Sequence, residues 1–345
     1  MSEHNKNMEF ILLGQKKKNR RFFTVIITLT LLSLIGAFLT IYLGNTIYSV
    51  ETIIRVFSGG EVENATFSIL TLRLPRMLAG LTAGFAFGFG GSVFQTMLRN
   101  PLANPNILGI TSASSVGALI CILLLNGGST VIFFGSIIGA TIVAVSIYML
   151  SKFKRYSVGR LILIGIAFQA MMNSLISYLL LIGNENDLSS AVRWMSGSLN
   201  GVSLSSIFPL ILVMIFCIPI IIAKAKDLEI LELGEESAIT LGINTNRTRG
   251  FLLIGAVVLV AVATATTGPI SFVSFLAGPI AKRITGYGNS SPITAGIFGA
   301  TLVLFSDLMG QNLFDTRFPV GVVTGLIGAP YLIYLLIRMN RHCEL

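Results

Sequence analysis

SSIFPLILVMIFCIPIIIAK, residues 205–224, is an apolar run long enough to cross a membrane, and DLEILELGEESAITLGINTNRTR, residues 227–249, follows it. A second apolar span begins at residue 249. The polar stretch carries five acids and two arginines in a chain that is only 11% charged. A simple turn between two helices needs about four to eight residues. We therefore expect this stretch, with a helix-compatible run at 235–241 between Gly234 and Gly242, to contact another molecule.

Composition places the chain among membrane proteins. Hydrophobic residues make up 53% of the sequence, and the mean hydropathy is +0.83. Long apolar spans predict membrane helices at 22–44, 76–97, 106–126, 130–151, 159–183, 205–224, 249–266, 291–310 and 318–338. A shorter run at 268–281, bounded by Gly and Pro, predicts a tenth helix that is short or partly broken. The predicted fold is an all-α polytopic membrane protein with about ten transmembrane helices, a tail at 1–21 and a membrane domain at 22–345.

The distribution of basic residues supports this count. If the N-terminus is cytoplasmic and the chain alternates sides, 19 of the 24 lysines and arginines lie inside. The other five lie outside: Arg55, Arg73, Arg76, Arg193 and Arg317. The positive-inside rule requires such a bias, so both termini are predicted to be cytoplasmic. The net charge of +9 follows from the same bias and gives no reason to invoke a nucleic acid partner.

Residues able to carry catalysis or bind a metal are scarce. His4 and His342 lie in the tails, and Cys121, Cys217 and Cys343 are isolated from one another. The sequence has no G-x-x-x-x-G-K-[ST] string, so no ATP-binding P-loop is predicted. We expect no enzymatic activity, no metal site and no cofactor in this chain.

Asp307 is the only carboxylate inside a predicted span. Ion-coupled carriers keep ionisable groups at membrane depth, where a charge is costly unless it has a function. Asp307 lies near the outer end of its helix, which favours a capping or interfacial role over ion coupling. An ion-coupled secondary carrier therefore stays open as the weaker alternative.

Small residues recur at helical spacing in two spans, at Gly80, Gly84 and Gly88 and again at Gly321, Gly325 and Gly328. We expect them to pack helices within the chain, with a subunit interface or a moving pore wall as the alternative. Polar residues inside spans could line a water-filled path or bond across helices: Gln95, Gln169, Asn173, Ser174 and Ser177.

Four strings together resemble the signatures of the FecCD-type permeases, which are the membrane subunits of ABC importers for ferric siderophores, haem and vitamin B12. They are RLPRMLAGLTAGFAFGFGGSVFQTMLRNPLANPNILGITSASSVGA (73–118), ILELGEESAITLGI (230–243), GPISFVSFLAGPIAKR (268–283) and FPVGVVTGLIGAPYLIYLL (318–336). The resemblance runs from about residue 25 to the C-terminus. It implies ten helices per chain, which agrees with the count from charge.

The resemblance also implies roles for two groups of residues. The coupling segment at 227–249 would seat in a groove on an ATPase subunit through Leu233, Gly234, Glu235, Ser237, Ala238, Leu241 and Gly242. On the outer face, Arg73 and Arg76 would pair with acidic residues of a substrate-binding protein. A third docking arginine of some relatives aligns near Gln311, and Arg317 is the expected replacement.

Two inner-face segments match positions that narrow the pathway in relatives: Asn100 and Leu102, and Ser157 to Gly159. One departure bears on assembly. Many relatives read P-H-I-A-R where this chain reads GPIAK at 278–282, so no role of that histidine transfers. The Gly-Pro version resembles subunits that pair with a different, related permease, which favours a heterodimer over a homodimer.

We therefore expect a permease subunit of an ATP-binding-cassette importer, moving ferric siderophores across a bacterial plasma (inner) membrane. Haem or cobalamin is the alternative cargo, and an ion-coupled secondary carrier is the alternative class. The expected partners are a second homologous permease chain, two cytoplasmic ATPase subunits, an external substrate-binding protein of the lipoprotein kind and the lipid bilayer. The sequence does not select the chelate.

Overall fold

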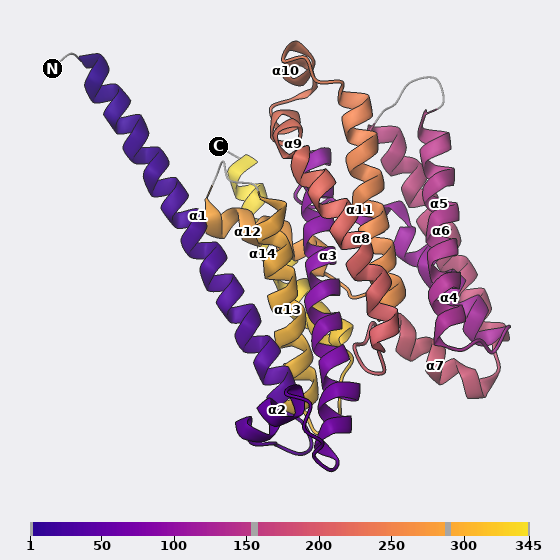
Figure 1. Ribbon diagram of the computed structural model, residues 1–345. Helices are drawn as coiled ribbons and strands as arrows, with labels where there is room; N and C mark the ends of the chain where they lie inside the picture. The colour runs from indigo at the N-terminus through magenta and orange to yellow at the C-terminus, as the bar shows by residue number, and fades with distance from the viewer. Residues whose placement is uncertain (1–2, 153–157, 287–290, 344–345) are drawn as a thin grey trace.

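The computed structural model describes residues 3–152, 158–286 and 291–343, and the described part is built of helices (Figure 1). The elements follow one another as α1 (Glu3–Tyr42), α2 (Val50–Phe57), η1 (Phe67–Arg73), α3 (Leu74–Leu98), η2 (Pro105–Leu108), α4 (Ile110–Leu123), α5 (Ser129–Lys152), α6 (Val158–Ile182), α7 (Glu185–Met195), α8 (Leu204–Ala223), α9 (Ala225–Glu232), α10 (Glu235–Thr240), α11 (Thr245–Thr267), α12 (Val273–Thr285), α13 (Pro292–Asn312) and α14 (Val320–Cys343). The π-helical η1 and α3 form one continuous rod.

Eight stretches of helix are long and apolar enough to span a membrane: residues 13–42, 67–98, 129–151, 159–182, 204–223, 245–267, 292–312 and 320–338. They coincide with eight of the ten predicted spans. The other two predicted spans, 106–126 and 268–281, correspond to the shorter helices α4 and α12. Both ends of the described chain lie at the same end of the bundle (Figure 1), as an even number of crossings requires.

The prediction for 106–126 is wrong in length. Pro105 opens a single 3-10 turn, and Gly109 then takes a left-handed conformation with φ of +69° before α4 begins. The 14 residues of α4 span about 21 Å, which is short of the hydrocarbon core of about 30 Å. The backbone break therefore shortens this helix at its N-terminal end.

Four short helices outside the predicted spans complete the ends of the bundle. α2 and α7 lie at the end opposite the termini, whereas α9 and α10 project from the same end as the termini (Figure 1). Residues from Glu3 onward are helical and continuous with the first membrane helix, so the predicted tail is mostly an extension of α1. Where that tail ends and the membrane begins stays a prediction.

α3 lies at the centre of the molecule, where it packs against α11, α12 and α13. In the most apolar stretch of α3, 72% of the residues are buried, and the same share is buried in α11. In α8 the share is only 17%. Helices such as α5, α6, α8 and α14 thus present long apolar faces outward, as expected for contact with lipid or another membrane chain.

Glycines on α3 allow backbone contact with its neighbours. A Cβ atom at Gly88 would lie 2.3 Å from the carbonyl oxygen of Ala295 on α13, and one at Gly84 would lie 2.7 Å from that of Gly299. The Gly80–Gly84–Gly88 face therefore packs within the chain, as predicted. The second series divides: Gly321 is closely packed, whereas a Cβ at Gly325 would meet nothing within 4 Å.

A buried ion pair joins the first turn of α3 to the last two turns of α13. Arg76 Nε and Nη2 each lie 2.8 Å from a different carboxylate oxygen of Asp307, whose side chain is 1% exposed. Gln311 Nε2 donates a further hydrogen bond to Asp307 Oδ2 at 2.6 Å. Asp307 is therefore not a helix cap, because its carboxylate is held in the interior by an arginine and an amide; an interfacial position stays a prediction.

We expect Gly88→Ala to lower the free energy of unfolding by about 1–3 kcal/mol, because the added methyl group overlaps a carbonyl that cannot move independently. Gly325→Ala is the matched control and should be neutral or slightly stabilising, since alanine favours helix by about 1 kcal/mol and the site is open. Thermal unfolding of the detergent-solubilised protein measures both. Equal unfolding midpoints for the two variants would contradict the close packing.

Asp307→Asn should cost about 3 kcal/mol of stability, because it leaves the Arg76 guanidinium largely buried without its counter-charge. The double variant Arg76→Met/Asp307→Leu should lose less, since it removes both charges together. Chemical or thermal unfolding in detergent distinguishes them. A single variant as stable as the wild type would show that the pair contributes nothing.

Candidate coupling and docking sites

The coupling segment forms a compact helical hairpin. Gly234 separates α9 from α10. Its φ of +126° is a backbone conformation that residues with a Cβ atom rarely adopt. Gly242, with φ of +82°, follows α10, and Asn244 then caps α11 by accepting a hydrogen bond from the Arg247 amide at 3.1 Å. The helix predicted at 235–241 is confirmed to within one residue. Two glycines thus shape the turns of the segment.

The side chains of this segment divide into a set buried against the bundle and a set exposed to solvent. Leu228, Leu231 and Ala238 are buried against the bundle. The exposed set lies at the end of the bundle from which α9 and α10 project. It includes Leu233, which is 68% exposed, and Leu241, which is 60% exposed. Exposed apolar side chains beyond the membrane helices are a feature of protein interaction sites. Of the predicted coupling residues, Ala238 therefore supports the segment from inside, and the following are accessible or partly accessible: Leu233, Gly234, Glu235, Ser237, Leu241 and Gly242.

Two ion pairs hold this segment on the bundle. Arg249 Nη1 on α11 lies 3.1 Å from Glu235 Oε2, and the Arg249 side chain is 4% exposed. Lys282 Nζ on α12 lies 3.0 Å from Glu232 Oε1 at the end of α9. Sequence reasoning did not find these pairs. The partners are 14 and 50 residues apart, so no helical spacing signals them.

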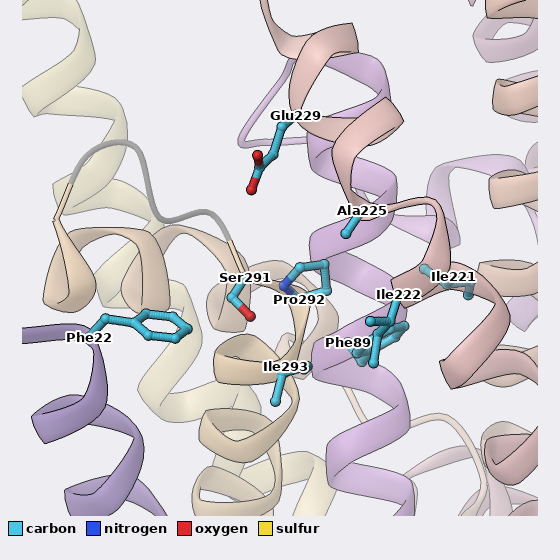
Figure 2. Close-up of a pocket in the computed structure, with 9 residues that line it drawn as sticks. All are labelled: Phe22, Phe89, Ile221, Ile222, Ala225, Glu229, Ser291, Pro292 and Ile293. Carbon is cyan, nitrogen blue, oxygen red and sulfur yellow. The ribbon is translucent and has the colours of Figure 1, made fainter. Parts of the chain in front are cut away.

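A cavity of about 240 Å³ opens beside α9 (Figure 2). Ala225 and Glu229 line it from α9, and Ser291 and Pro292 line it from the start of α13. Phe22 reaches toward it from α1, and Phe89, Ile221, Ile222 and Ile293 complete the apolar lining. The first helix of the coupling segment is therefore not packed tightly against α13.

Two of the predicted gate residues, Asn100 and Leu102, lie in the turn after α3. Arg99 ends α3 in a left-handed conformation, and Asn100 Oδ1 then accepts a hydrogen bond from the Leu102 amide at 2.8 Å. This turn leads into η2, which packs on α6. Gly159 is exposed near the start of α6, and Ser157 lies outside the described residues. The gate role of these residues stays a prediction.

The three arginines predicted to dock a binding protein differ in environment. Arg73 is buried and donates hydrogen bonds to the carbonyl oxygens of Ile41, Tyr42 and Thr46, at 2.7, 3.1 and 2.6 Å. It thereby satisfies main-chain acceptors at the end of α1. Arg76 is held by Asp307, as described above.

Arg317 is exposed in the loop before α14, where it hydrogen-bonds the side chain of Asn45. Docking stays a prediction for all three arginines. Arg317 is the one whose side chain is exposed.

Polar side chains also lie on the outward face of α6. Asn173, Ser174 and Ser177 are exposed in the isolated chain, and Ser112 on α4 donates a hydrogen bond to Asn173 Oδ1 at 2.9 Å. Polar groups at this depth normally face protein or a water-filled path rather than lipid. Ser174 and Ser177 donate to carbonyl oxygens one turn earlier in α6, so Asn173 is the side chain that favours a covering chain or an aqueous pathway at this face.

Comparison with known proteins agrees with this arrangement. The model of the FecCD transport family matches residues 29–338. The ferric enterobactin transport system permease protein FepG of Escherichia coli (strain K12) is 35% identical over 287 residues, covering 82% of this chain and 86% of the relative. The iron(3+)-hydroxamate import system permease protein FhuG of Bacillus subtilis (strain 168) is 31% identical, covering 94% and 100%.

Among solved structures, a metal-chelate type ABC transporter in an inward-facing conformation superposes with a TM-score of 0.81 at 28% identity. The match covers 91% of this chain and 99% of that one. The family match extends over most of the described helices, including the coupling segment and all three outer arginines. This multi-pass membrane protein belongs to the FecCD transport family.

Proposed function

We propose that this chain is a permease subunit of an ATP-binding-cassette importer that moves ferric siderophores into the cytoplasm. The observation that carries the proposal is the hairpin of α9 and α10, which projects beyond the membrane helices (Figure 1) and exposes Leu233 and Leu241 to solvent. A partner with an apolar groove would bury these side chains and could move the hairpin as a unit. The partner proposed here is an ATPase subunit, which performs the hydrolysis.

A second permease chain would complete the membrane part. The Asn173 side chain on the outward face of α6 is costly to expose to lipid and would be covered or hydrated between two chains. We favour a different, related permease as the second chain, on the basis of the Gly278–Pro279 departure. Two ATPase copies and an external binding lipoprotein would complete a complex in the bacterial inner membrane.

The proposed cargo follows from the relatives, whose names specify ferric enterobactin and iron(3+)-hydroxamate. Haem or cobalamin is the second candidate. An ion-coupled carrier is less well supported by the described residues, because Arg76 and Gln311 already occupy the Asp307 carboxylate.

Uptake into proteoliposomes tests the class. The chain is reconstituted with its partner permease, ATPase and binding protein, and offered radiolabelled ferric enterobactin, an iron(3+)-hydroxamate or cobalamin. We expect uptake of an iron chelate only when the ATPase subunit and enclosed ATP are present. Uptake that follows an ion gradient and needs neither would overturn the proposal.

In the same assay, Leu233→Asp should reduce uptake by at least about tenfold, because an unpaired carboxylate in an apolar groove costs more than about 1.4 kcal/mol. The control is Thr240→Asp, which places the same charge on the exposed face of α10. Thr240→Asp should retain most of the activity. Normal uptake and normal ATPase binding by Leu233→Asp would exclude this side chain from the contact.

Arg317→Glu should weaken binding of the external protein by about tenfold at low salt, since like charges then oppose each other at the rim of the contact. The difference should shrink in about 0.5 M salt, where the Debye length falls to a few ångströms. Surface plasmon resonance measures the affinity between the complex and the external protein. The control is Arg193→Glu, at another exposed arginine predicted to lie on the outer face. An affinity that is the same for both variants and the wild type at low salt would remove Arg317 from the docking site.

A further inference from the structure

Side chains from three helices meet the last turn of α12. Lys282 Nζ lies 3.0 Å from Glu232 Oε1 on α9. The next residue, Arg283, donates from Nη1 to Tyr334 Oη on α14 at 3.1 Å, and its guanidinium lies 5.5 Å from the centre of that ring. Arg21 of α1 donates from Nη2 to the carbonyl oxygen of Arg283 at 3.1 Å. Two consecutive residues thus connect α12 with α9, α14 and α1.

The opposite end of α12 is fixed on the central helix α3. Gln95 Nε2 donates to the carbonyl oxygen of Phe275 at 3.0 Å, and a Cβ at Gly91 would lie 2.1 Å from the carbonyl oxygen of Ser274. Pro279 lies inside the helix between the two ends. A proline there lacks the main-chain donor and is a common point of bending. The last turn can therefore move relative to the start of the helix.

α9 has space in which to move. The cavity of about 240 Å³ lies between Ala225 and Glu229 on α9 and the first residues of α13 (Figure 2). Glu232 lies one turn beyond Glu229 on the same helix. Among the ion pairs of the described residues, Glu232–Lys282 is the one that connects α9 with another helix of the bundle. Motion of α9 beside the cavity would therefore pull directly on α12.

We propose that Lys282 is a positioning residue that transmits displacement of the coupling segment, through Glu232, to the last turn of α12. Arg283 then passes the displacement to α14 through Tyr334. This inference rests on the proposed function, because it needs an ATPase subunit that moves the segment. It assigns a transmission route that differs from direct packing of α9 on α3 and α8.

The chain offers a matched pair for testing the route. Lys282→Met breaks the link from the α12 side and leaves the coupling segment unchanged. Lys224→Met breaks the pair with Asp227, at 2.9 Å, which joins residues only three positions apart and reaches no other helix. The double variant Glu232→Lys/Lys282→Glu exchanges the two charges and should restore the link.

The measurement is the number of chelate molecules imported per ATP hydrolysed by the complete complex in proteoliposomes. The probe is the radiolabelled iron chelate that the wild-type complex imports in the assay above. We expect Lys282→Met and Glu232→Lys to lower this ratio by at least about fivefold, a change of about 1 kcal/mol or more. The exchanged double variant should recover to within about twofold, and Lys224→Met should stay within about twofold.

Each possible result either supports or overturns transmission through the Glu232–Lys282 pair. An unchanged ratio in Lys282→Met overturns the proposal, and so does a lowered ratio that the charge exchange fails to restore. A lowered ratio in Lys224→Met as large as that in Lys282→Met also overturns it, because the effect is then not specific to the link. Variants that fail to co-purify with the ATPase subunit show instead that the pair serves assembly, which also contradicts transmission. Failure of the proposed function is seen separately, as wild-type uptake without ATPase or ATP.

Discussion

The contact between the backbones of α3 and α13 is the constraint on which the rest of the structure depends. In a bilayer, apolar side chains gain little free energy by exchanging lipid contacts for protein contacts. Helices therefore associate through close packing and polar contacts. Gly84 and Gly88 remove the side chains that would separate α3 from Gly299 and Ala295. With α3 fixed in this way, α11 and α12 pack on its other faces, and the remaining helices form the perimeter.

The second constraint is that polar groups at membrane depth need partners within the protein. Near the outer end, Arg73 satisfies carbonyl groups where α1 ends, and Arg76 and Asp307 neutralise each other. Farther along α3, Gln95 satisfies a carbonyl at the start of the short helix α12. Each of these side chains lies where a helix ends or where two helices are held together. The few charged residues inside this bundle therefore have a structural function that the composition alone does not reveal.

Much of the fold could be predicted from sequence because membrane helices carry a strong local signal. Span length and the Gly80–Gly84–Gly88 spacing each act within one helix, and the structure agrees with them. Features that depend on distant residues could not be predicted. The burial of Arg73, the partner of Asp307 and the Lys282–Glu232 pair all join segments more than 25 residues apart. The short α4 was missed because apolar composition continued across the backbone break at Gly109.

The two anchors of the coupling segment lie on opposite sides of Gly234. α9 is tied to α12 through Lys282, and α10 is tied to α11 through Arg249. α11 is a long helix whose apolar stretch is mostly buried in the bundle, whereas α12 is short and contains a proline. A push on the hairpin would therefore meet a stiff support on one side and a compliant one on the other. Gly234, in a conformation accessible mainly to glycine, forms the turn between the two anchored helices. Under the proposed mechanism, the asymmetry of the anchors would convert displacement of the hairpin into bending of α12 rather than translation of the whole bundle.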